Sequence, residues 1–215
     1  MQRLRIRFDR GEEVKFISHL DLMRLWQRAL TRAGMPLAYS EGFNPRPRMS
    51  LAAPLALGVT SEAELMDIVL AEWASPHHFS SALSRQLPPG IRIQQVHQLP
   101  LTLPSLQSQV RHAEYRVILE TDKSQPEVEA TIAGLLAAGE LPWQHQRDTG
   151  PRHYDLRALI DGIWLIDRPP GRCTLGMKLR NDNSGSGRPE QVAAALGFAR
   201  YPQSIHRTRL ILKTA

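Results

Sequence analysis

The residues best suited to chemistry lie between positions 15 and 50, where a helical pattern leads into a loop rich in proline, glycine and arginine. The two prolines of this loop fix backbone torsion angles and remove N–H donors, and its glycine permits a turn that would strain other residues. Its asparagine and arginines then present hydrogen-bond donors on a rigid protruding loop, residues 39–48, which we call the ledge. Such a surface suits an anionic or planar ligand. The loop residues that we predict to face this ligand are Tyr39, Ser40, Glu41, Phe43, Asn44, Arg46 and Arg48.

The helix before the loop carries a stripe of arginines. Arg24, Arg28 and Arg32 recur every four residues, which places their side chains on one side of the helix, opposite its apolar residues. Such a stripe is also typical of an ordinary solvated helix face. Because Lys15 and the arginines of the loop flank the same helix, we predict one composite surface for a polyanion.

His19 lies in the first turn of this helix and is the candidate catalytic residue. With Asp21 and Glu41 nearby, its imidazole would act as a general base oriented by a carboxylate. The alternative is a histidine that only hydrogen-bonds the start of the helix and the following loop. Neither His19 nor the adjacent pair His77-His78 has the spacing of a metal site such as H-x-x-x-H, so we predict no metal.

A second anion site is indicated by residues 185–190, where a glycine-rich loop containing Arg188 leads onto a helix with free N–H groups. A mobile surface loop explains the same residues. The segment is not a P-loop, because G-x-x-x-x-G-K-[ST] is absent. The G-x-S-x-G and G-x-G-x-x-G motifs are absent too, which argues against serine hydrolases and nucleotide-dependent oxidoreductases.

The elements that must position these residues follow from hydrophobic periodicity. Leu4, Ile6 and Phe8 alternate with arginines, which predicts a strand with one buried and one cationic face. Ser18 followed by Asp21 resembles a capping box and begins the helix. The predicted elements are strand 3–8, helix 18–33, strands 49–57 and 64–70, helix 75–86 and strand 91–96. This β-α-β-β-α-β order is that of a ferredoxin-like domain.

Residues 98–112 contain two prolines and no regular period, so we interpret them as a linker between domains 1–97 and 113–215. In the second domain, Asp161-Gly162 is a hairpin signal. Its predicted elements are strand 115–119, helix 125–138, strands 141–147, 154–160, 162–167 and 173–179, helix 189–196 and strand 207–213. We therefore predict an α+β fold of two tandem ferredoxin-like (β-α-β-β-α-β) units with antiparallel sheets, the second with an inserted hairpin.

Composition limits the class of protein. Of 215 residues, 42% are hydrophobic and 22% charged, which is typical of a folded chain. Lysine and arginine outnumber aspartate and glutamate by 27 to 21, which suits a polyanion but also fits a protein that is arginine-rich for compositional reasons alone. The single cysteine, Cys173, excludes an intramolecular disulfide and a cysteine-ligated cluster within this chain. We expect a cytoplasmic protein without membrane contact, because no signal-peptide segment and no long apolar run are present.

Five short segments of the sequence stand out as motifs rich in polar, glycine and proline residues. They are Lys15–Asp21 with Arg24, Ala38–Pro47, Leu57–Glu62, Tyr154–Arg157 and Gly187–Pro189. These strongly resemble the radical-SAM-linked protein family, whose members are fused to the C-terminus of a radical SAM protein or encoded beside one. The resemblance implies a radical SAM partner that carries a cysteine-bound [4Fe–4S] cluster and S-adenosylmethionine. This chain itself would hold no cofactor, since it lacks the three cysteines that such a cluster needs.

The function that these observations favour is a non-catalytic accessory protein that handles the substrate of a radical SAM enzyme and binds RNA, either tRNA or rRNA. Phosphate contacts from the arginines would supply affinity, and Phe43, Tyr39 or Trp26 would stack a base. One alternative is an endoribonuclease of the CRISPR repeat-processing type that uses His19, an analogy at the level of fold. Another is a protein-interaction module that docks the radical SAM partner.

Overall fold

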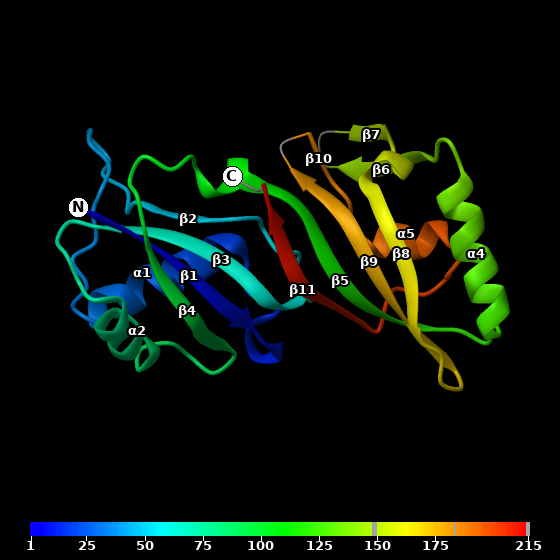
Figure 1. The fold of residues 1–215 in the computed structure, drawn as a ribbon, viewed down its shortest axis with the longest axis horizontal. Helices are drawn as coiled ribbons and strands as arrows, with labels where there is room; N and C mark the ends of the chain where they lie inside the picture. Colours follow the sequence, from blue (N-terminus) through cyan, green and yellow to red (C-terminus); the bar gives the residue numbers. More distant parts are fainter. Residues whose placement is uncertain (148–149, 183, 214–215) are drawn as a thin grey trace. The chain divides into compact units, whose positions relative to one another are not determined.

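The computed structural model describes residues 1–147, 150–182 and 184–213. The chain divides into two compact units, Met1–Val110 and Arg111–Ala215. Both units combine helices with mostly antiparallel strands, and the described residues contain five α-helices (Figure 1). The predicted α+β class with antiparallel sheets is therefore confirmed.

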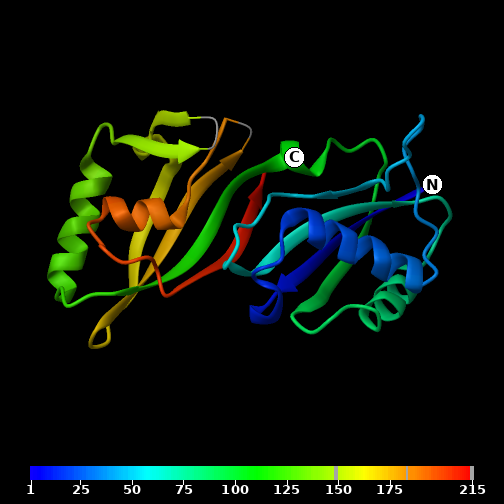
Figure 2. The same ribbon diagram turned by 180° about the vertical axis from the view of Figure 1, so that it is seen from behind.

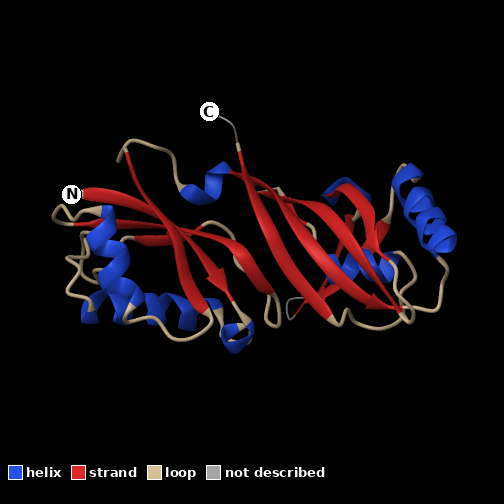
Figure 3. Cartoon of the chain, turned by 60° about the horizontal axis from the view of Figure 1, so that its bottom comes forward, coloured by secondary structure: helices blue, strands red, loops and turns tan. Residues whose placement is uncertain are grey.

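Unit 1 is a sheet with two helices on one face, as Figures 2 and 3 show. Its elements are β1 (Gln2–Arg10), a 3-10 turn (Glu12–Val14), α1 (His19–Arg32), β2 (Met49–Leu51), β3 (Thr60–Leu70), α2 (Pro76–Ser84), β4 (Ile91–Leu99) and α3 (Leu106–Gln109). The strand order is β4-β1-β3-β2, and each neighbouring pair runs antiparallel.

The core of unit 1 forms between this sheet and its helices. Leu4, Ile6 and Phe8 of β1 are fully buried, as the alternating pattern predicts. Trp26 of α1 is also fully buried, and its ring meets that of Phe8 edge-on at a centroid distance of 4.8 Å. The apolar side of α1 therefore faces the sheet, and its arginine side faces solvent.

Two boundaries in unit 1 differ from the prediction. The strand predicted at 49–57 ends at Leu51 in β2, and Pro54 follows in irregular chain. The segment 98–112, predicted to be a linker, holds the end of β4 and the helix α3, and Leu106 of that helix is fully buried. The first unit consequently extends to Val110, past the predicted limit at residue 97.

Unit 2 contains a sheet and a separate hairpin. Its elements are β5 (Val110–Glu120), α4 (Gln125–Ala137), β6 (Pro142–Arg147), β7 (Gly150–Asp155), a 3-10 turn (Arg157–Leu159), β8 (Ile160–Asp167), β9 (Arg172–Asp182), β10 (Gly185–Ser186), α5 (Pro189–Ala195) and β11 (Ser204–Leu212). In the sheet, β5 lies between β9 and β11, while β8 and β10 also pair with β9. The hairpin is formed by β6 and β7.

The sequence predicted a hairpin turn at Asp161-Gly162, but the chain does not reverse its direction there. Asp161-Gly162 makes no turn, because both residues lie within β8, at a register shift between Ile160 and Gly162. A β-bulge accommodates a glycine at such a position without any reversal of the chain. The reversal takes place between β6 and β7, whose connecting residues 148–149 are outside the described part of the chain.

Among the described residues, no helix is long and apolar enough to cross a membrane.

Candidate functional site

The start of α1 is fixed by its own side chains. The Ser18 hydroxyl oxygen accepts a hydrogen bond from the Asp21 N–H at 3.1 Å, and the Ser18 hydroxyl donates to the Asp21 carboxylate at 2.7 Å. Arg24 donates to the same carboxylate at 3.1 Å. The Ser18 bond, followed by the Arg24 bond, holds the pKa of Asp21 below its ordinary value. Asp21 therefore stays ionised and orients the first arginine of the stripe.

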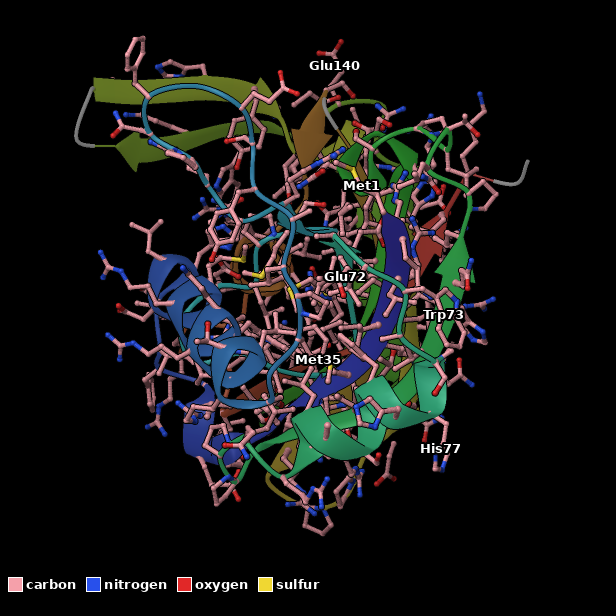
Figure 4. The ribbon with its side chains drawn as sticks, turned by 90° about the vertical axis from the view of Figure 1, so that its left-hand side faces the viewer. Met1, Met35, Glu72, Trp73, His77 and Glu140 are labelled. Atoms are coloured by element: carbon pink, nitrogen blue, oxygen red, sulfur yellow. The ribbon has the colours of Figure 1, made fainter. Side chains whose placement is uncertain are left out.

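The arginine stripe lines an open groove of about 630 Å³ between α1 and the chain that follows α2. Arg24, Arg28 and Arg32 form one wall, and Arg85 joins them from the opposite side. The groove floor and edges are Ile17, Asp21, Leu25, Gln86, Leu87 and Pro88. In Figure 4, nitrogen-tipped side chains extend outward from α1. The spacing predicted the stripe, but only the fold brings Arg85 to it.

The charge of this groove is strongly positive. The described residues that line it include four arginines and one carboxylate, that of Asp21, which leaves a net charge of +3. Arg32 is held in place because it donates to the Gln86 carbonyl at 2.7 Å and to the Gln86 side chain at 3.1 Å. A second hollow between Arg24, Arg28 and Arg32 continues the surface along the helix. Closely spaced guanidinium groups in an open groove are suited to a chain of phosphates.

The loop 39–48 is ordered by its own backbone. The Ser40 N–H donates to the Arg46 carbonyl at 2.9 Å, and the Arg46 N–H donates to the Ser40 hydroxyl at 3.0 Å. Phe43 at its tip is fully exposed, and the side chains of Glu41, Asn44, Arg46 and Arg48 are also exposed. The loop is therefore closed at its base by these two bonds and presents its arginines to solvent, and its rigidity stays a prediction.

This ledge does not join the start of α1 in one composite site. The Gly58 N–H, two residues before β3, donates to the Lys15 carbonyl, whereas Val69 near the end of β3 bonds both Ala38 and Arg48. Thr60 at the start of β3 and Val69 near its end are nine residues apart, which separates the two regions along the strand by about 30 Å, at roughly 3.3 Å per residue. Figure 1 shows the same arrangement, with α1 beginning near the end of β1 and the loop near its start.

Among the described residues, no side chain orients the imidazole of His19. Its side chain is exposed and makes no hydrogen bond within the described chain, and Ser40 and Glu41 lie with the distant ledge. The side chain of Lys15, which precedes the helix, pairs with Glu12 at 2.6 Å and lies over the Phe16 ring at 5.2 Å. Among the described residues, no group of three histidines, cysteines or carboxylates could hold a metal ion. The geometry thus lacks the oriented base that the sequence suggested.

Arg3 and Arg5 of β1 are not free for a ligand, contrary to the predicted cationic face. Arg3 and Arg5 both donate to the carboxylate of Asp67 on β3, at 2.6 to 3.0 Å. Asp67 is the residue that sequence reasoning missed, although a carboxylate flanked by apolar residues in the middle of the predicted strand 64–70 was its signal. Trp26, proposed to stack a base, is likewise unavailable because it is fully buried in the core.

Arg188 belongs to unit 2, and its surroundings differ from the predicted flexible loop. Gly185 and Ser186 form β10, which pairs with Asp182 and Asn181 of β9. Gly187 is buried, and its N–H donates to the Arg180 carbonyl at 2.8 Å. The following helix α5 has only seven residues. Arg188 is exposed at its start, but the segment is an ordered part of the sheet edge rather than an open anion-binding loop.

Fold and site together define an α+β protein with an arginine-lined groove on its first unit. Residues 3–189 match the model of a family described as "Uncharacterized protein conserved in bacteria (DUF2344)". The match spans most of the chain, so the protein belongs to this family. No curated protein matches the sequence.

Solved structures share the fold. A chain of the "Crystal Structure of a Cbf5-Nop10-Gar1 Complex" is similar with a TM-score of 0.57 and 10% identity, over 96% of this chain and 48% of that chain. A chain in the "Structure of H/ACA RNP bound to a substrate RNA containing 2'-deoxyuridine" has a TM-score of 0.52 and 12% identity, over 96% and 47%. A chain of the archaeal box H/ACA sRNP Nop10-Cbf5 complex has a TM-score of 0.50 and 12% identity, over 97% and 48%. The present chain thus spans about half the length of the chains it matches.

Proposed function

We propose that this protein binds RNA through the groove between α1 and the chain that follows α2 and presents that RNA to a radical SAM enzyme. The observation that carries the first part is the convergence of Arg24, Arg28, Arg32 and Arg85 on one open groove with a single carboxylate. Phosphate groups would occupy the groove, and the rigid loop 39–48 would add contacts through Phe43 and its arginines. The RNA would be a tRNA or an rRNA.

Two further facts support this proposal. The chain carries a net charge of +6, which favours an anionic partner. Its fold is shared with chains of RNA–protein complexes, one of which is described as bound to a substrate RNA. At 10 to 12% identity these likenesses concern the fold, so the RNA partner remains our proposal and rests on the groove itself.

The order of strands and helices in each unit supports a more specific assignment of the fold. In unit 1 the strand order β4-β1-β3-β2 and the element order β-α-β-β-α-β are those of a ferredoxin-like domain. In unit 2 the corresponding order is β11-β5-β9-β8, with α4 and α5 in the equivalent places and the β6–β7 hairpin inserted. We propose that the chain is a tandem of two ferredoxin-like units.

The radical SAM partner is proposed from the motifs Lys15–Asp21, Ala38–Pro47 and Leu57–Glu62. Two of these motifs meet in space, because the Gly58 N–H donates to the Lys15 carbonyl at 2.9 Å. The [4Fe–4S] cluster and S-adenosylmethionine would belong to the partner. Purification of the tagged chain from its own cells should recover a protein with C-x-x-x-C-x-x-C and bound iron, and recovery without such a protein would refute this part.

A salt titration of RNA binding tests the groove. For a single strand held by four arginines, log Kd should change with log salt with a slope of about 3, at about 0.7 per phosphate contact. Arg24→Gln with Arg28→Gln should lower that slope by about 1.4. The matched control is Arg92→Gln with Arg200→Gln, which removes the same charge from two exposed arginines outside the groove. Equal slopes for the two double variants would refute the groove as the binding site.

The same samples decide between binding and cleavage. RNA incubated with the protein alone should remain intact, because His19 lacks an orienting partner among the described residues. Cleavage that disappears in His19→Ala would establish the endoribonuclease alternative instead. If no RNA binds at low salt but the radical SAM protein is still recovered, the chain is a docking module.

A further inference from the structure

Within the described residues of unit 2, one face of the sheet has no helix over it. The odd-numbered residues of β9, such as Leu175 and Met177, are fully buried together with Val117 of β5. Figures 1 and 2 agree that α5 covers one side of these strands, behind the sheet in Figure 1 and in front of it in Figure 2. The even-numbered residues of β5 and β9 therefore point to the opposite side, where Arg116 and Arg180 are exposed.

A tryptophan lies against the middle of this open face. Trp164 of β8 is directly opposite Gly176 of β9, and its indole covers that glycine. A Cβ atom at position 176 would lie within 2.1 to 2.5 Å of three atoms of the indole ring. Only glycine lets the ring approach the strand so closely, and Trp164 is nevertheless 43% exposed. One ring face is thus pressed on the sheet, and the other is open.

Arg116 completes the arrangement on the far side of Gly176. It is opposite Gly176 in the pairing of β5 with β9, so Trp164, Gly176 and Arg116 form one row across three strands. Neighbouring cations are paired, since Lys178 bonds Asp161 and the Arg180 Nε lies 3.4 Å from an Asp182 carboxylate oxygen. Arg116 makes no hydrogen bond or ion pair within the described chain. An open indole and a free guanidinium therefore lie side by side.

We propose that this row binds one nucleotide of a single-stranded RNA, with the base stacked on Trp164 and its phosphate held by Arg116. Aromatic side chains on an open sheet stack bases regardless of their identity, and a guanidinium beside them neutralises the backbone. The inference rests on the proposed function and extends it to a second contact, on unit 2. A purely structural role would have the indole do no more than shield the backbone at Gly176.

Binding of a labelled single-stranded RNA, measured by fluorescence anisotropy, separates these roles. Trp164→Leu should weaken binding by roughly 5- to 150-fold, the range found when a stacking ring is removed. Trp164→Phe keeps a ring and should lose much less, and Arg116→Gln should reduce the salt slope by about 0.7. The matched control is Trp73→Leu, which removes a tryptophan that is 69% exposed on unit 1 (Figure 4). RNA that contains 5-iodouridine should crosslink to the peptide that holds Trp164.

The outcomes are distinct from those of the groove test. If the wild-type protein binds no RNA, both proposals fall. If RNA binds and responds to the groove variant, but Trp164→Leu binds as tightly as Trp73→Leu and no crosslink reaches Trp164, only the present inference is overturned. Should Trp164→Leu unfold, as circular dichroism would reveal, Trp164→Phe and the crosslink decide the question.

Discussion

Asp67→Asn is expected to destabilise unit 1 strongly, because it removes the charge that pairs with two nearly buried arginines. The Asp67 carboxylate is the shared acceptor of Arg3 and Arg5, through four hydrogen bonds of 2.6 to 3.0 Å. The Asp67 side chain is 4% exposed, and those of the two arginines are 9% and 14% exposed. Removal of the negative charge leaves two nearly buried guanidinium groups without a counter-ion.

The size of the expected loss in the free energy of unfolding follows from the burial of these three side chains. Breaking a buried ion pair by removal of one partner costs about 3 to 5 kcal/mol, because the remaining charge stays desolvated. Domains are stable by about 5 to 15 kcal/mol in total, so the variant should lose a large part of its stability. With a urea m-value of about 1 to 3 kcal/mol/M, the midpoint of unfolding should fall by roughly 1 to 5 M.

The assay is urea unfolding followed by circular dichroism and tryptophan fluorescence, with Asp161→Asn as the matched control. Asp161 pairs with Lys178, but both side chains are more than one-third exposed, so that change should cost less than about 1 kcal/mol. Arg3 also donates to the carbonyls of Leu103 and Pro104. Asp67→Asn should therefore expose residues 100–105 to proteolysis as well. A midpoint no lower than that of Asp161→Asn would refute the argument.

Three other outcomes are expected. Cys173 is fully buried, which raises the pKa of its thiol, so a thiol reagent should label it only after denaturation. Hydrogen bonds from the Ser124 side chain and backbone lower the pKa of Glu127 from its ordinary value of 4.5. The ionised Glu127 therefore stabilises the folded chain fully above pH 4.5, and this stabilisation is lost as the pH falls through the lowered pKa. The difference in Tm between wild type and Glu127→Gln should accordingly shrink on acidification. Gly176→Ala should displace the indole of Trp164 and shift its emission to the red without loss of secondary structure.

Much of the local structure followed from sequence. The alternation of Leu4, Ile6 and Phe8 predicted β1, and the arginine spacing predicted the outer face of α1. Both patterns report which side of one element faces the core, a property that the periodicity of a single segment determines. The ends of strands were predicted less accurately. Pro54 and the bulge near Gly162 change the course of the backbone, and hydrophobic periodicity carries no information about such changes.

The candidate site was predicted only in part, because contacts between residues far apart in the sequence decide which side chains share a surface. The sequence by itself determined the class of fold and the arginine stripe, since each depends on the pattern of residues close in the chain. Tertiary structure decided which of them share a surface. It brought Arg85 to the stripe, set the ledge at the other end of β3, and paired the β1 arginines with Asp67. It also laid Trp164 over Gly176, because strand register joins residues far apart in sequence.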